Sequence, residues 1–88
     1  MIELSFIAGG NIRKVVIDKR KISLLTAETG WIPISMDLDR IDEKIEKKMG
    51  KEGAKLLKEI SILNSEEEMA RDITKDFQRT GWRLVKKI

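Results

Sequence analysis

Residues 2–17 read IELSFIAGGNIRKVVI and contain the pattern that decides the fold of this 88-residue chain. Residues 2–6 alternate apolar and polar side chains, which is typical of a strand buried on one face. The turn at residues 8–11 holds two glycines, which tolerate the positive φ angles of a hairpin. Residues 12–17 are rich in β-branched side chains and apolar on both faces, as an interior strand is. The stretch therefore predicts a β-hairpin.

Further strands are indicated on both sides of a helical region. A charged turn at residues 18–21 precedes a third strand at 22–26. Residues 31–35 are a possible fourth strand, which Pro33 would confine to a sheet edge because proline cannot donate a ladder hydrogen bond. Residues 82–88 predict a final strand that returns to the sheet. The tripeptide Thr-Gly-Trp occurs at 29–31 and at 80–82, and we interpret it as a coincidence in which a glycine turns the chain towards a strand.

The helical region begins where apolar residues change to a spacing of three and four. Leu38, Ile41, Ile45 and Met49 follow this spacing, which places a helix start near Met36. The glycines at positions 50 and 53 favour a break, because each would cost about 1 kcal/mol relative to alanine inside a helix. One long helix and two shorter ones both remain open.

A second helix start is marked by the sequence Ser-Glu-Glu-Glu at residues 65–68, which matches a capping box. Met69, Ala70, Ile73 and Phe77 form its apolar stripe, and Gly81 stands where a glycine commonly ends a helix. The order of elements predicts one α+β domain over residues 1–88. It would have a small antiparallel sheet (an N-terminal β-meander plus a C-terminal strand) covered on one face by two or three helices.

The amino-acid composition argues against several classes of function. The chain has no Cys, His or Tyr, so the commonest general base and the thiolate metal ligands are missing, and we expect no enzyme activity and no cofactor. No apolar run approaches the roughly 20 residues that span a bilayer, so we expect no membrane association and a cytoplasmic protein. Thirteen isoleucines with heavy use of Lys and Glu resemble proteins that work at high temperature, and we infer a thermophilic source.

Basic side chains gather towards the two ends of the chain, and nine of them are expected on strands, strand ends or turns of one sheet. They are Arg13, Lys14, Lys19, Arg20, Lys21, Arg79, Arg83, Lys86 and Lys87. With Trp31 and Trp82 nearby, they could contact nucleic acid through a basic sheet face. Solubility and edge protection explain the same residues, and the net charge of only +3 favours that explanation.

One acidic cluster could hold a divalent cation through oxygen ligands, and it consists of Asp37, Asp39, Asp42 and Glu43. Carboxylates at the start of a helix are common for electrostatic reasons alone, so we favour a solvated helix terminus and predict no metal site.

Three functions follow in order of preference. The first is a non-catalytic interaction module that binds itself as a homodimer, or another protein in a larger assembly, because so short a chain has few elements to cover every apolar face. The second is nucleic-acid binding through the basic sheet face. The third is a metal-dependent enzyme at Asp37, Asp39 and Asp42.

Overall fold

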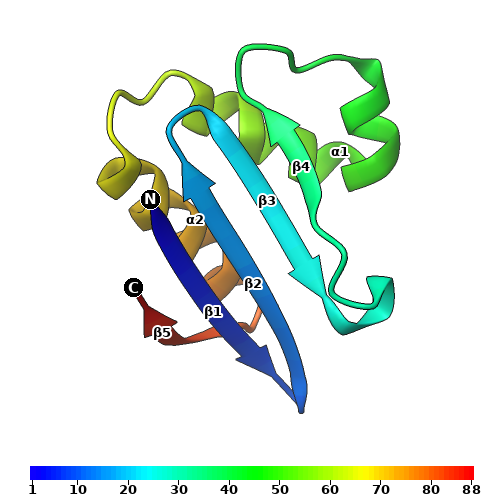
Figure 1. The fold of residues 1–88 in the computed structure, drawn as a ribbon, viewed down its shortest axis with the longest axis vertical. Helices are drawn as coiled ribbons and strands as arrows, with labels where there is room; N and C mark the ends of the chain where they lie inside the picture. The colour runs from blue at the N-terminus through cyan, green and yellow to red at the C-terminus, as the bar shows by residue number, and fades with distance from the viewer.

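The computed structural model describes residues 1–88 and shows a five-stranded antiparallel sheet with two helices on one face (Figure 1). The strands follow the order β4-β3-β2-β1-β5 across the sheet, so the first and last strands of the chain are neighbours. In chain order the elements are β1 (Ile2–Ala8), β2 (Asn11–Asp18), β3 (Lys21–Thr26), the 3-10 turn η1 (Ala27–Thr29), β4 (Ile34–Asp37), α1 (Glu43–Ser61), α2 (Glu66–Arg79) and β5 (Arg83–Lys87). The predicted α+β fold class is confirmed.

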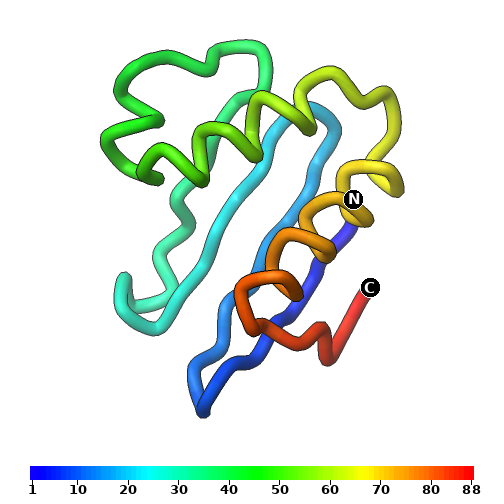
Figure 2. The backbone as a smooth tube through the Cα atoms, turned by 180° about the vertical axis from the view of Figure 1, so that it is seen from behind, coloured from blue at the N-terminus to red at the C-terminus, as the bar shows by residue number.

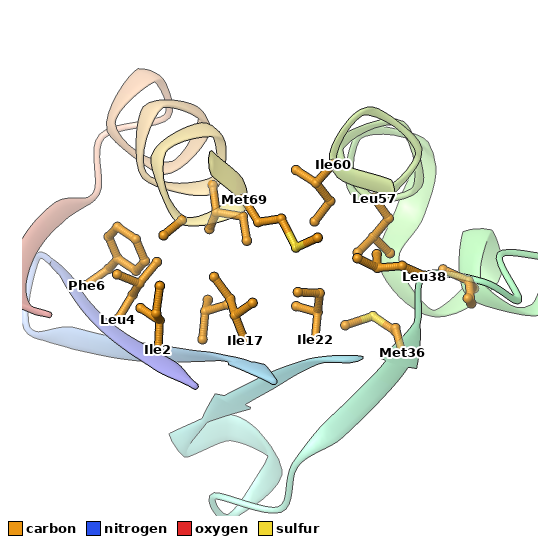
Figure 3. Close-up of a cluster of buried hydrophobic side chains, with 14 residues drawn as sticks. Ile2, Leu4, Phe6, Ile17, Ile22, Met36, Leu38, Leu57, Ile60 and Met69 are labelled. Carbon is orange, nitrogen blue, oxygen red and sulfur yellow. The ribbon is translucent and has the colours of Figure 1, made fainter. Parts of the chain in front are cut away.

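The core lies between the sheet and the helices (Figures 2 and 3). Alternate residues of β1, namely Ile2, Leu4 and Phe6, point to this side, and Leu4 and Phe6 are fully buried. They lie on the side of the core below α2, which contributes Met69, and Ile60 of α1 lies farther across the sheet, above Ile22 (Figure 3). Because side chains alternate along a strand, the remaining residues of β1 lie on the face that no helix covers.

Two predictions about the middle of the chain need correction. Met36 belongs to β4 and pairs with Ile22, so it is a strand residue and not the start of a helix. Met36 and Leu38 are both buried and lie two positions apart, which is strand spacing, whereas Leu38 also lies at helical spacing from Ile41. The strand starts after Pro33 and lies at the sheet edge, as Pro33 requires, but it runs to Asp37 where the pattern placed its end at residue 35.

Helix α1 begins at Glu43, later than expected, and is kinked at Gly50. Asp42 is its N-cap, and its side chain accepts from the backbone N–H groups of Lys44 and Ile45. Gly50 has φ 75° and ψ 174°, which lie outside the helical region and are accessible to glycine. The choice between one helix and two is thus settled as a kink at Gly50.

Specific hydrogen bonds define where helix α2 begins and where it ends. The Ser65 hydroxyl oxygen accepts from the backbone N–H of Glu68 at 3.1 Å, which confirms the predicted cap. At the other end, Trp82 N–H donates to the Phe77 carbonyl and Gly81 N–H donates to the Gln78 carbonyl. These two bonds form a Schellman motif, which turns the chain so that β5 can pair with β1.

We expect Ser65→Ala to lower the free energy of unfolding by about 1 kcal/mol, because the N–H of Glu68 loses its capping partner. Urea unfolding followed by circular dichroism measures the change. Asn64→Ala is the control, since the neighbouring Asn64 is exposed and caps nothing, and it should stay within about 0.5 kcal/mol of the parent. Equal stability of both variants would contradict the cap.

Candidate interaction surfaces

The helices lie on one side of the sheet, and we call the opposite side the open sheet face (Figure 1). Its register places these strand residues there: Glu3, Ser5, Ile7, Ile12, Lys14, Val16, Asp18, Lys21, Ser23, Leu25, Ser35, Asp37, Arg83 and Lys86. The apolar members lie in the middle strands. Ser5 is only 7% exposed although no helix covers it, because it lies between Lys14 and Lys86 in the register.

Charge on the open sheet face is divided along the strand direction. In the half nearest the β1–β2 turn, the charged strand residues are Lys14, Arg83 and Lys86. In the half nearest the β2–β3 turn they are Glu3, Asp18, Lys21 and Asp37. One half is therefore basic and the other is acidic overall.

The nine basic candidates do not form one patch. Lys14, Lys21, Arg83 and Lys86 lie on the open sheet face, whereas Arg13 and Lys87 alternate to the helix-covered face. Lys87 pairs there with Glu67 at 2.8 Å. Lys19 and Arg20 form the β2–β3 turn, and Arg79 is the last residue of α2, paired with Asp76, and not a strand or turn residue as expected.

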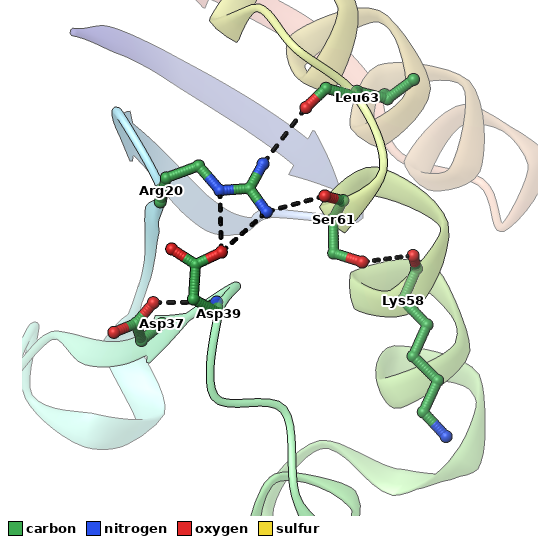
Figure 4. Close-up of polar contacts among 6 residues, drawn as sticks. All are labelled: Arg20, Asp37, Asp39, Lys58, Ser61 and Leu63. Atoms are coloured by element: carbon green, nitrogen blue, oxygen red, sulfur yellow. Dashed lines mark hydrogen bonds and ion pairs between the residues drawn. The ribbon is translucent and has the colours of Figure 1, made fainter.

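The Arg20 side chain donates four hydrogen bonds that hold the fold together (Figure 4). Its guanidinium donates to Asp39 Oδ1 at 3.2 and 3.0 Å, to the Leu63 carbonyl at 3.1 Å and to the Ser61 carbonyl at 2.7 Å. It thus joins the β2–β3 turn to the loop before α1 and to the end of that helix, where a cation is favourable. These bonds leave little of Arg20 for a ligand.

The carboxylates of the acidic cluster also make hydrogen bonds within the fold. Asp37 accepts from the backbone N–H of Asp39 at 2.9 Å, Asp39 binds Arg20, and Asp42 caps α1. No group of three or more acidic side chains is positioned to hold a metal ion. The carboxylates therefore have structural roles in the loop between β4 and α1.

The carboxyl group of Glu66 has a lowered pKa. Its hydrogen bond with the N-terminal ammonium of Met1 lowers the pKa of Glu66, and the backbone N–H of Lys19, at 2.6 Å, acts in the same direction. The same contact raises the pKa of the ammonium group. Glu66 thereby links the start of α2 to β1 and to the β2–β3 turn.

Each tryptophan lies beside a basic residue of β2, and the two pairs are on opposite faces of the sheet. Lys14 Nζ lies 5.7 Å from the ring centroid of Trp31, and Arg13 Cζ lies 4.4 Å from that of Trp82. Arg13 and Lys14 are adjacent in β2 and therefore point to opposite faces.

The repeated Thr-Gly-Trp tripeptide explains why each tryptophan is held in place. Trp31 N–H donates to the Thr26 carbonyl just as Trp82 N–H donates to that of Phe77, so both copies close the same kind of turn. The repeat is visible in the sequence. The sequence alone did not show that each tryptophan of the repeat lies beside a basic residue of β2.

An apolar groove opens on the helix-covered face, between α1, α2 and the sheet. It has a volume of about 210 Å³, and Leu24, Leu56 and Phe77 are among the side chains that line it. Arg13, Asp76 and Thr80 are the polar side chains among its lining residues. Phe77 belongs to the apolar stripe expected for the second helix, and it is among the residues that line this groove.

Replacing Arg20 tests its structural role. We expect Arg20→Lys to lower the free energy of unfolding by about 1–2 kcal/mol, because lysine cannot reach Asp39 and two backbone carbonyls with one planar group. Lys21→Gln, a change to the exposed neighbouring residue, should stay within about 0.5 kcal/mol of the parent. Chemical denaturation of both variants measures the difference, and a tolerated Arg20→Lys would show that the bonds of Figure 4 contribute little.

The structure therefore presents two surfaces that could bind a partner, the open sheet face and the apolar groove. Neither helix is long and apolar enough to cross a membrane. No protein-family model, no curated protein and no solved structure matches this chain.

Proposed function

We propose that this chain is a non-catalytic interaction protein that forms a homodimer through its open sheet face. The division of that face into a basic and an acidic half carries the proposal. A twofold axis in the plane of the interface and perpendicular to the strands places the basic half of one copy over the acidic half of the other. With the axis at Val16, Lys14 lies over Asp18 of the second copy.

Apolar side chains supply the centre of such an interface. Ile7, Val16 and Leu25 lie among the charged residues of the open sheet face, and Ile12 and Trp31 are 41% and 42% exposed. Two sheets pack about 10 Å apart with their side chains interdigitated, which would bury these residues. An interface with an apolar centre and a charged rim is the usual arrangement in dimers.

The size of the face is also suitable. Figure 1 looks onto this face along the shortest axis, and seen this way the outline of the whole molecule measures 32 by 26 Å. A standard interface buries about 800 Å² on each partner, which a face of this size can supply. A sheet that packs on a second copy also removes exposed apolar surface that would otherwise favour aggregation.

The test is the mass in solution and its response to paired charge reversals. Light scattering on a sizing column should give twice the monomer mass of 10.1 kDa. Lys14→Glu should raise the dimer dissociation constant about ten-fold or more, because it places like charges opposite each other. Adding Asp18→Lys to the same chain should restore the dimer, since the opposite charges then face each other again.

Lys55→Glu is the matched control, because Lys55 is an exposed lysine of α1 on the other side of the molecule. It changes the net charge equally and should leave the dimer intact. A strictly monomeric parent protein, or a Lys14→Glu variant that dimerises as well as the parent, would overturn the proposal.

Nucleic-acid binding is the second candidate, favoured by Lys14, Arg83 and Lys86 in the basic half near the exposed Trp31. The acidic half opposes it, because its carboxylates repel phosphates. We expect weak binding that falls with a log–log salt slope of about 0.9 per phosphate contact on duplex DNA and is lost near physiological ionic strength. Fluorescence anisotropy with labelled duplex and single strands measures it. Sub-micromolar binding by a monomer at about 0.15 M salt would reverse the ranking.

A further inference from the structure

The groove between α1 and α2 is lined differently at its base and at its rim. Side chains from the sheet and from both helices form apolar walls, among them Val15, Leu24, Met49, Leu56 and Phe77. Its volume of about 210 Å³ exceeds that of an engineered apolar cavity of about 150 Å³ that accepts benzene. The groove can therefore hold a small apolar group.

The polar side chains that line the groove differ in whether they already have an ion-pair or hydrogen-bond partner. Asp76 is paired with Arg79, and the Thr80 hydroxyl donates to the Phe77 carbonyl. Arg13 makes no ion pair and no side-chain hydrogen bond, and its guanidinium carbon lies 4.4 Å from the ring centroid of Trp82. Stacking on the ring uses the flat face of the guanidinium, so its N–H groups remain free to donate.

From this arrangement we propose that the groove binds a small aliphatic monocarboxylic acid. The hydrocarbon chain lies against the apolar walls, and the carboxylate accepts two hydrogen bonds from Arg13. A single guanidinium matches a single negative charge. A dianion such as phosphate is disfavoured, because Asp76 is close to the same rim and a phosphate has no apolar part to fill the groove.

Arg13 is held in position by the same elements that form the groove. The Schellman turn after α2 places Trp82, and the pairing of β2 with β1 places Arg13 opposite Phe6. Phe6 in turn stacks on Phe77 with ring centroids 4.3 Å apart. The guanidinium is therefore pre-organised, which reduces the entropy lost on binding.

The experiment compares octanoate with octan-1-ol, which has the same chain and no charge. Two-dimensional amide NMR titrations give the dissociation constants. In a Trp31→Phe variant, the fluorescence of Trp82, then the sole tryptophan, reports on the rim. We expect octanoate to bind in a saturable manner and about ten-fold or more tightly than octan-1-ol, with shifts confined to the groove.

Substitutions then locate the site. Arg13→Gln should weaken octanoate binding about ten-fold or more and leave octan-1-ol unchanged, and Arg13→Lys should have an intermediate effect. Lys55→Gln is the charge control, because it removes the same charge from an exposed residue of α1 that does not line the groove, and it should change the binding of neither ligand. Leu24→Trp should fill the groove and abolish binding of both.

Three results would overturn the proposal. They are the absence of octanoate binding to the parent protein, equal affinity for octanoate and octan-1-ol, and unchanged octanoate binding in both Arg13 variants. Melting curves of each variant without ligand establish that it is folded, and a folded Arg13→Lys keeps the test decisive if Arg13→Gln does not fold.

Discussion

The packing of Ile2, Leu4 and Phe6 beneath α2 is the contact on which the rest of the structure depends. β1 lies between β2 and β5, so its register determines which side chains of both neighbours face the core. A slip of one residue would turn the polar residues of β1 into the core and expose the apolar set. The same register sends Arg13 to the groove and Lys14 to the open sheet face, so one packing contact defines both candidate binding surfaces.

Local signals in the sequence were sufficient for most of the fold. The alternation in residues 2–6, the cap at Ser65 and the stop at Gly81 each depend on chemistry within a few residues, and each is present in the structure. The start of α1 was misplaced because Leu38 lies three positions before Ile41, which is a helical spacing, and also two positions after Met36, which is a strand spacing. Pairing of β4 with β3 decides between the two, and that contact is not local.

The candidate surfaces were less predictable, because they depend on contacts between distant residues. The partners of Arg20 lie 19 to 43 residues away along the chain, so sequence could not show that its charge is already used. Arg83 and Lys86 both face outward although they are three positions apart, because the register shift opposite Ser5 and Phe6 places one extra residue in β5. Simple alternation would have placed these two basic residues on opposite faces.

The adjacent pair Arg13 and Lys14 shows why the two surfaces suit different partners. Arginine on the helix-covered face is flanked by an aromatic ring and apolar walls, where a planar, weakly hydrated cation is easier to desolvate than an ammonium group. Lysine on the open sheet face keeps a compact, hydrated charge, which favours an ion pair with a carboxylate of a second copy. The difference follows from the environment of each face, so exchanging the two residues would conserve net charge and still place each cation where its hydration is unfavourable.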